Sequence, residues 1–235
     1  MIPPVHATRS LLARLGASRS GNALLEFGFS LPIFLSIGVW AIETGNFSLT
    51  NLRVSQVALN LADNAARVGL MNALQTEQLR EVDMNDVLQA TRLQGAPINL
   101  TTFGRVTVSS LEADSAGVQS IHWQRCIGVR SGAGYDSSYG TTTVTDGTDT
   151  TPANDGTLAP GGMGDAGNQV TAPPNSGVMF VEINYDYQPV IAKWLFGAQK
   201  IHYVASFIVR DRRDFSRIFN PSPTATRSTC NLHNA

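Results

Sequence analysis

One carboxylate stands alone in a long apolar stretch of this sequence. From Ala23 to Ile42 the chain has twenty residues, and Glu26 is the one ionisable residue among them. A helix of that length, at about 1.5 Å per residue, crosses roughly 30 Å of hydrocarbon. An unpaired carboxylate at the centre of such a segment costs about 2.5–3.5 kcal/mol on insertion scales, so an intramembrane glutamate indicates a function. The sequence therefore predicts that a positive charge neutralises Glu26.

The residues before the apolar stretch indicate a source for that charge. Three arginines with no acidic residue among them precede it, namely Arg9, Arg14 and Arg19. Gly21 follows them. If a peptidase cut the chain after Gly21, Asn22 would carry a new α-amino group. Glu26 would then be the fifth residue of the mature chain, one helical turn from that amine.

This arrangement resembles a type IV prepilin, in which a basic leader ends in glycine and is cleaved on the cytoplasmic side of a hydrophobic segment. The glutamate at the fifth mature position is followed by an aromatic residue, here Phe27, and then by Leu31-Pro32. Within that superfamily the chain is most similar to the TadE-like pseudopilins of tight-adherence (Flp) pilus systems. The stretches from Val181 to Pro189 and from Phe207 to Arg213 also resemble the C-terminal strands of those proteins.

The resemblance implies cleavage between Gly21 and Asn22 by a prepilin peptidase. It also implies an assembly role for Glu26, Phe27 and Pro32, with the carboxylate facing the N-terminal amine of a neighbouring subunit. Pro32 has a second interpretation, as a proline that a membrane helix tolerates. The implied partners are other pilins or pseudopilins, the inner-membrane assembly platform and membrane lipid.

Three other interpretations of the apolar stretch remain open. The first is a secretory signal peptide cleaved after Val39-Trp40-Ala41, the second an uncut signal anchor, and the third a buried core helix. Signal peptides usually lack a charge inside their apolar region, which favours the prepilin. The mass of the mature chain distinguishes the first case, since a signal peptidase would leave Ile42 as the first residue.

The arginines also predict the topology. Positive residues stay on the cytoplasmic side, so the N-terminus is expected in the cytoplasm and the C-terminal domain in the periplasm of a single-pass inner-membrane protein. In that oxidising compartment Cys126 and Cys230, which lack metal-ligand spacing, are expected to form a disulfide rather than two free thiols.

The sequence contains few features of catalysis, metal binding or nucleic-acid binding. The four histidines, at positions 6, 122, 202 and 233, share no ligand spacing, and we find no phosphate loop or nucleophile motif. We therefore expect no catalytic, cofactor-binding or metal-binding residue, and an enzyme is the weaker class. The net charge of −1 gives no field that would attract nucleic acid. The mixed charges of Arg210–Asp214 are expected to form surface pairs of little worth.

The elements that position these residues are predicted from periodicity. Beyond Ile42, apolar residues recur at three- and four-residue steps, as one face of a helix that continues from the membrane and packs on the domain. They are Phe47, Val54, Val57, Ala58, Leu61, Ala65 and Val68. One or two short helices are expected between about 74 and 94, with their acidic residues on a solvated face.

Four segments have the alternating, β-branched pattern of strands. They are residues 101–111, 118–129, 178–187 and 201–209. The predicted fold class is α+β, a long N-terminal helix packed on a four-stranded antiparallel sheet, as in pilins. Residues 131–177 contain five aspartates and no lysine or arginine, so we expect them to bury little apolar surface and to form a mobile loop.

The predicted organisation has five parts: a leader (1–21), a transmembrane and assembly helix (22–42), a helical continuation (43–95), an extracytoplasmic β-rich domain (96–220) and a tail (221–235). The predicted function is that of a minor pilin or pseudopilin for a tight-adherence pilus. The alternative is a signal-anchored or exported adhesive or binding domain whose function resides in residues 131–177.

Overall fold

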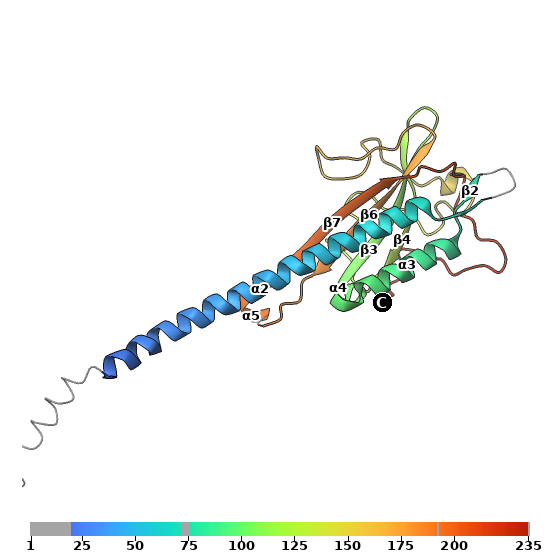
Figure 1. Ribbon diagram of the computed structural model, residues 1–235. Helices are drawn as coiled ribbons and strands as arrows, with labels where there is room; N and C mark the ends of the chain where they lie inside the picture. Colours follow the sequence, from blue (N-terminus) through green and yellow to red (C-terminus); the bar gives the residue numbers. More distant parts are fainter. Residues whose placement is uncertain (1–19, 72–75, 192, 235) are drawn as a thin grey trace, which may run out of the picture. The chain divides into compact units, whose positions relative to one another are not determined.

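The computed structural model describes residues 20–71, 76–191 and 193–234 (Figure 1). The chain divides into two compact units, one ending at Asn46 and the other beginning at Phe47. Helix α2 (Ser20–Arg67) has 48 residues and contributes to both units. The predicted helical continuation beyond Ile42 is therefore confirmed as far as Arg67.

An arginine from a distant part of the sequence caps the C-terminal end of helix α2. The Arg213 guanidinium donates hydrogen bonds to the carbonyl of Ala65 at 3.1 Å and to that of Val68 at 2.8 Å. A cation is favourable at a helix C-terminus, where carbonyl groups lack intrahelical donors. Gly69 follows, at a position where a Cβ atom would lie 2.5 Å from the Glu77 side chain. The prediction that Arg213 forms a weak surface pair is wrong, because it is buried and caps α2.

Two short strands and three helical segments follow α2. Strands β1 (Leu70–Met71) and β2 (Glu77–Gln78) form a separate antiparallel pair. Helix α3 (Glu81–Gly95) is the short helix that we predicted. The 3-10 helix η1 (Ala96–Ile98) and the single turn α4 (Leu100–Phe103) lead into the main sheet.

The main sheet is antiparallel and has the strand order β5-β4-β3-β6-β7. Four of its strands match the predicted segments to within a few residues. They are β3 (Gly104–Ala113), β4 (Gln119–Ile127), β6 (Ser176–Asp186) and β7 (Lys200–Ile208). The predicted count of four is wrong, because β5 (Thr157–Leu158) adds a fifth strand beside β4. Two residues are too short for an alternating pattern.

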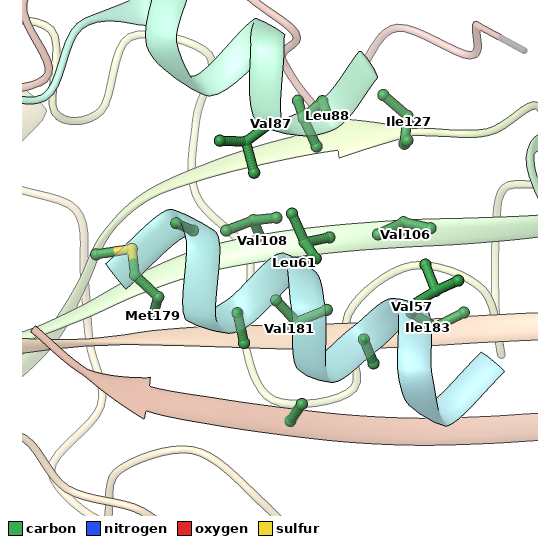
Figure 2. Close-up of a cluster of buried hydrophobic side chains, with 14 of the residues drawn as sticks. Val57, Leu61, Val87, Leu88, Val106, Val108, Ile127, Met179, Val181 and Ile183 are labelled. Atoms are coloured by element: carbon green, nitrogen blue, oxygen red, sulfur yellow. The ribbon is translucent and has the colours of Figure 1, made fainter. Parts of the chain in front are cut away.

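Helices α2 and α3 cover one face of this sheet (Figure 2). Leu61 of α2 belongs to the same buried cluster as Val108 of β3 and Val181 of β6. Leu88 of α3 and Ile127 of β4 extend that cluster. The predicted α2 face is confirmed, with Phe47 and Val68 partly buried and the other five residues buried in this core. This packing supports the coarse fold class, α+β with a long N-terminal helix.

The opposite face of the sheet is covered by the polar segment 131–177, which also contains the 3-10 helix η2 (Pro152–Asn154). A second cluster joins Phe180 of β6 to Ala159, Met163 and Ala172 of this segment. The Gln119 side chain donates to the Ala172 carbonyl at 2.9 Å and accepts from its N–H at 2.8 Å. The prediction that the segment buries little apolar surface is wrong. The sheet contributes Leu111, Ala113, Ile121, Val178 and Phe180 to this cluster, so the three segment side chains are enough to complete it.

Candidate functional site: the apolar half of helix α2

The first unit presents an exposed apolar helix. The segment from Gly21 to Arg67 is long and apolar enough to cross a membrane, and none of the residues in its most apolar stretch is buried. Its large apolar side chains are 59–74 % exposed at Leu24, Leu25, Phe27, Phe29, Ile33, Phe34, Leu35, Ile37, Trp40 and Ile42. The interpretation as a buried core helix is therefore wrong. A secretory signal sequence near the N-terminus can be equally apolar, so composition alone does not distinguish it from a membrane span.

The predicted cleavage and assembly residues all lie on this helix. Gly21 and Asn22 are exposed in its first turn. Glu26 follows Asn22 by four residues, so the two lie on one helical face, one turn apart. Phe27 is exposed beside Glu26, and Pro32 lies inside the helix.

The Glu26 carboxylate contrasts with the other polar groups of this half-helix. The hydroxyl of Ser36 donates to the Pro32 carbonyl at 2.7 Å, and that of Thr44 donates to the Trp40 carbonyl at 2.9 Å. Such bonds to the preceding turn satisfy a hydroxyl without water. Among the residues that the structure describes, none forms a hydrogen bond or ion pair with Glu26. The described part of the chain therefore supplies no partner for this carboxylate.

The two cysteines form the expected disulfide. Cys126 of β4 and Cys230 of the C-terminal tail are bonded, with a sequence separation of 104 and 4.8 Å between their Cα atoms. The fully buried Arg105 reinforces this closure, because its guanidinium donates to the carbonyls of Cys230 and Leu232 in the tail and of Gly128 after β4. The tail is thus fixed to the sheet by the disulfide, by Arg105 and by backbone hydrogen bonds from the N–H groups of Cys126 and Gly128 to the carbonyls of Ser228 and Asn234, each 2.7 Å long.

A second buried arginine fixes helix α3 to the sheet. Arg125 of β4 and Glu81 of α3 are both fully buried, and the Arg125 Nε donates to the Glu81 Oε2 at 2.9 Å. Arg227 of the tail adds a second cation, with its Nε 3.4 Å from the Glu81 Oε1. The expectation that the acidic residues of this region lie on a solvated face is wrong for Glu81, and also for Glu77 and Asp83, which are buried.

Sequence patterns did not identify these arginines as structural residues. Arg105 and Arg125 lie within strands whose residues are buried on both sides. The one sequence feature that could have identified them is a charged residue inside a segment with the apolar, β-branched pattern of a strand. Such a charge is normally interpreted as an exposed strand position. Arg105 is buried beneath the tail, and Arg125 is buried against Glu81 of α3.

His122 of β4 belongs to another buried polar cluster. Its Nδ1 lies 2.8 Å from the Glu112 Oε2, and the Ser110 hydroxyl donates to the other Glu112 oxygen at 2.5 Å. Burial lowers the pKa of His122, but the hydrogen bond to Glu112 and the charges of Glu112, Asp155 and Asp146 outweigh it. The pKa of His122 is therefore raised, and its protonated form is favoured in the folded chain.

This shift predicts a pH dependence of stability. A histidine whose pKa is raised on folding contributes stability that is fully present below its unfolded pKa of about 6.5 and is lost as pH rises through the folded pKa. Urea unfolding of the full-length protein in mild detergent should therefore show a higher midpoint at pH 6 than at pH 8.5. The difference should shrink in His122→Gln and persist in the control His202→Gln, at an exposed position of β7. An undiminished difference in His122→Gln would contradict this assignment.

In the described part of the chain, no group of three or more histidine, cysteine, aspartate or glutamate side chains is placed to hold a metal ion. Comparison with known proteins adds no relative: no protein-family model, no curated protein and no solved structure matches this chain significantly.

Proposed function

We propose that this chain is a minor pilin or pseudopilin of a tight-adherence (Flp) pilus. The observation that supports it is the exposed apolar segment Ala23–Ile42 of α2, whose single carboxylate, Glu26, lies one turn after Asn22. The resemblance of those residues to the TadE-like prepilin motif supplies the reaction, cleavage of the Gly21–Asn22 peptide bond by a prepilin peptidase.

In this function the helix has two successive environments. The mature subunit is held in the inner membrane by residues 22–42, and it then packs with the helices of other pilins or pseudopilins at the assembly platform. Lipid chains are as apolar as the helix surface, so this transfer gains little hydrophobic free energy. The register of packing is then decided by the pairing of Glu26 with the Asn22 amine of a neighbouring subunit. Phe27 and Pro32 shape the same contact.

The topology follows from the same proposal. The leader arginines stay in the cytoplasm, and the folded domain lies in the periplasm. The Cys126–Cys230 disulfide supports this placement, because such bonds persist in oxidising compartments. The domain has a structural role rather than an enzymatic one.

Cleavage is tested by the mass of the mature protein. After coexpression with a prepilin peptidase we expect a chain that begins at Asn22. Gly21→Leu should retain the leader, whereas the matched control Gly28→Leu should be processed normally, since a side chain at either glycine meets open space. A mature chain that begins at Ile42 would indicate a signal peptide, and one that keeps its arginines would indicate a signal-anchored binding domain.

The role of Glu26 is tested by its removal. Glu26→Ala should leave membrane insertion intact, because it makes the span more apolar, and should abolish incorporation into pili. Insertion is measured by resistance to carbonate extraction, and assembly by the pilus fraction sheared from cells. Ser30→Ala is a matched control, since the Ser30 hydroxyl donates within its own helix, to Phe27. Normal piliation in Glu26→Ala would remove this carboxylate from the mechanism.

A further inference from the structure

The connection between β6 and β7 exposes apolar side chains that the domain core does not use. Trp194 is 86 % exposed, the highest value among the large apolar residues that the structure describes, and Val190 and Ile191 are 66 % and 44 % exposed. The chain from Tyr187 to Lys200 contains two lysines and no acidic residue. We call this connection, from Tyr187 to Gln199, the apolar hairpin.

The described residues of the apolar hairpin, 187–191 and 193–199, include a closed base and one helical turn. Its ends are joined by a hydrogen bond from the Tyr187 N–H to the Gln199 carbonyl, 2.8 Å long. Trp194 lies on the single helical turn α5 (Lys193–Phe196). Gly197 ends this turn with a φ of 67°, and its N–H donates to the Lys193 carbonyl at 3.0 Å. This is a common glycine termination of a helical turn, and the exposed Trp194 lies on the turn that it closes.

The base of the apolar hairpin lies at one particular end of the domain. The Tyr187 ring contacts the Phe47 ring edge to face, with 5.0 Å between centroids. Phe47 follows Ile42, the predicted end of the membrane segment, by five residues, which along a helix is about 7.5 Å. The hairpin therefore starts at the end of the domain where the membrane-length helix enters it.

We propose that the apolar hairpin is a second membrane contact, seated in the headgroup region of a phospholipid bilayer. Tryptophan is enriched at that interface because its ring is apolar and its N–H is polar. The exposed Lys193 can extend its ammonium to lipid phosphates, and the segment from Tyr187 to Lys200 has no carboxylate that would oppose this. The inference rests on the proposed function in one respect, that residues 22–42 span a membrane.

The test places the full-length protein in vesicles of phosphatidylethanolamine and phosphatidylglycerol that contain nitroxide-labelled lipids. In the variant Trp40→Phe, the tryptophan emission comes from Trp194 and from the buried Trp123. The double variant Trp40→Phe/Trp194→Phe retains Trp123, so it measures the Trp123 background that is subtracted. A nitroxide near the lipid headgroup should remove most of the Trp194 emission. A nitroxide at the bilayer centre should have a smaller effect.

A matched control uses an exposed residue at the far end of the sheet. Leu158 pairs with Ser120 of β4, which in turn pairs with Glu112 near the end of β3. Tyr185, two residues before the hairpin, pairs with Gly104 at the beginning of β3. Leu158 and the hairpin therefore lie at opposite ends of the sheet. Leu158→Trp, added to the double variant, should emit without quenching by either label. Equal quenching at the two positions would overturn the proposal, since it would reflect collisions rather than docking.

The remaining outcomes separate this inference from the proposed function. In the single variant Trp194→Phe, the emission of Trp40 reports whether residues 22–42 lie in the bilayer. The labelled lipids should quench that emission. If Trp40 is quenched and Trp194 is not, the hairpin inference is wrong and the span stands. If Trp194 is protected from acrylamide without lipid quenching, protein covers it and the lipid assignment is wrong. An unquenched Trp40 overturns the membrane span, and with it the hairpin contact.

Discussion

Glu81→Ala is expected to destabilise the folded domain by about 3–5 kcal/mol, the usual cost of removing one partner from a buried ion pair. The Glu81 carboxylate is fully buried and accepts hydrogen bonds from the Arg125 guanidinium, which is also fully buried. Arg227 approaches the same carboxylate from the tail. Without Glu81 the buried Arg125 charge has no counterion among the residues that the structure describes. The contacts of α3 and of the tail with β4 should therefore weaken together.

The measurement is urea unfolding of the full-length protein in mild detergent, followed by tryptophan fluorescence in a Trp40→Phe/Trp194→Phe background, which leaves the buried Trp123 as the emitting tryptophan. Asp63→Ala is the matched control, because Asp63 forms an ion pair with Arg67 at 2.7 Å on the exposed side of α2. An exposed pair at this spacing contributes about 0.3–0.5 kcal/mol, so the control should change little. If the free energies of unfolding of Glu81→Ala and Asp63→Ala differ by less than about 1 kcal/mol, the buried pair does not have the stabilising role that its burial implies.

Loss of the disulfide should have an effect of similar size. Closing a loop of about a hundred residues stabilises a folded chain by up to about 4.7 kcal/mol in the chain-entropy model. The Cys126–Cys230 bond closes a loop of that length, with a sequence separation of 104. When the tail separates from the sheet, the fully buried Arg105 also loses the carbonyls of Cys230 and Leu232. We therefore expect the double variant Cys126→Ser/Cys230→Ser to lose about 3–5 kcal/mol.

This expectation is checked by comparing oxidised and reduced protein. Dithiothreitol should lower the urea midpoint of the wild-type protein to that of the double variant, which should itself not respond to the reductant. The wild-type protein should show no reactive thiol before reduction, because both cysteines are bonded. A midpoint that reduction leaves unchanged would show that the tail is held by noncovalent contacts such as those of Arg105.

The sequence alone determined the features that depend on neighbours along the chain. The α2 face that includes Val57 and Leu61 was predictable because helical periodicity needs only local spacing. The four longer strands were predictable for the same reason, and the cysteine pair followed from the expected compartment. The motif around Gly21 and Glu26 is also local, since it lies within two turns of one helix. The structure adds that this helix is exposed and that the described chain offers Glu26 no partner.

Only the tertiary structure decided which polar residues are buried. Arg105, Arg125 and Glu81 have the sequence context of exposed charges, and they are buried because segments far away in the sequence cover them. Strand β5 exists because β4 offers it a partner. The contact of Phe47 with Tyr187, which places the apolar hairpin, joins residues 140 positions apart. Periodicity and motifs carry no information about such pairs, because the free energy of a long-range contact depends on which surfaces the folded chain brings together.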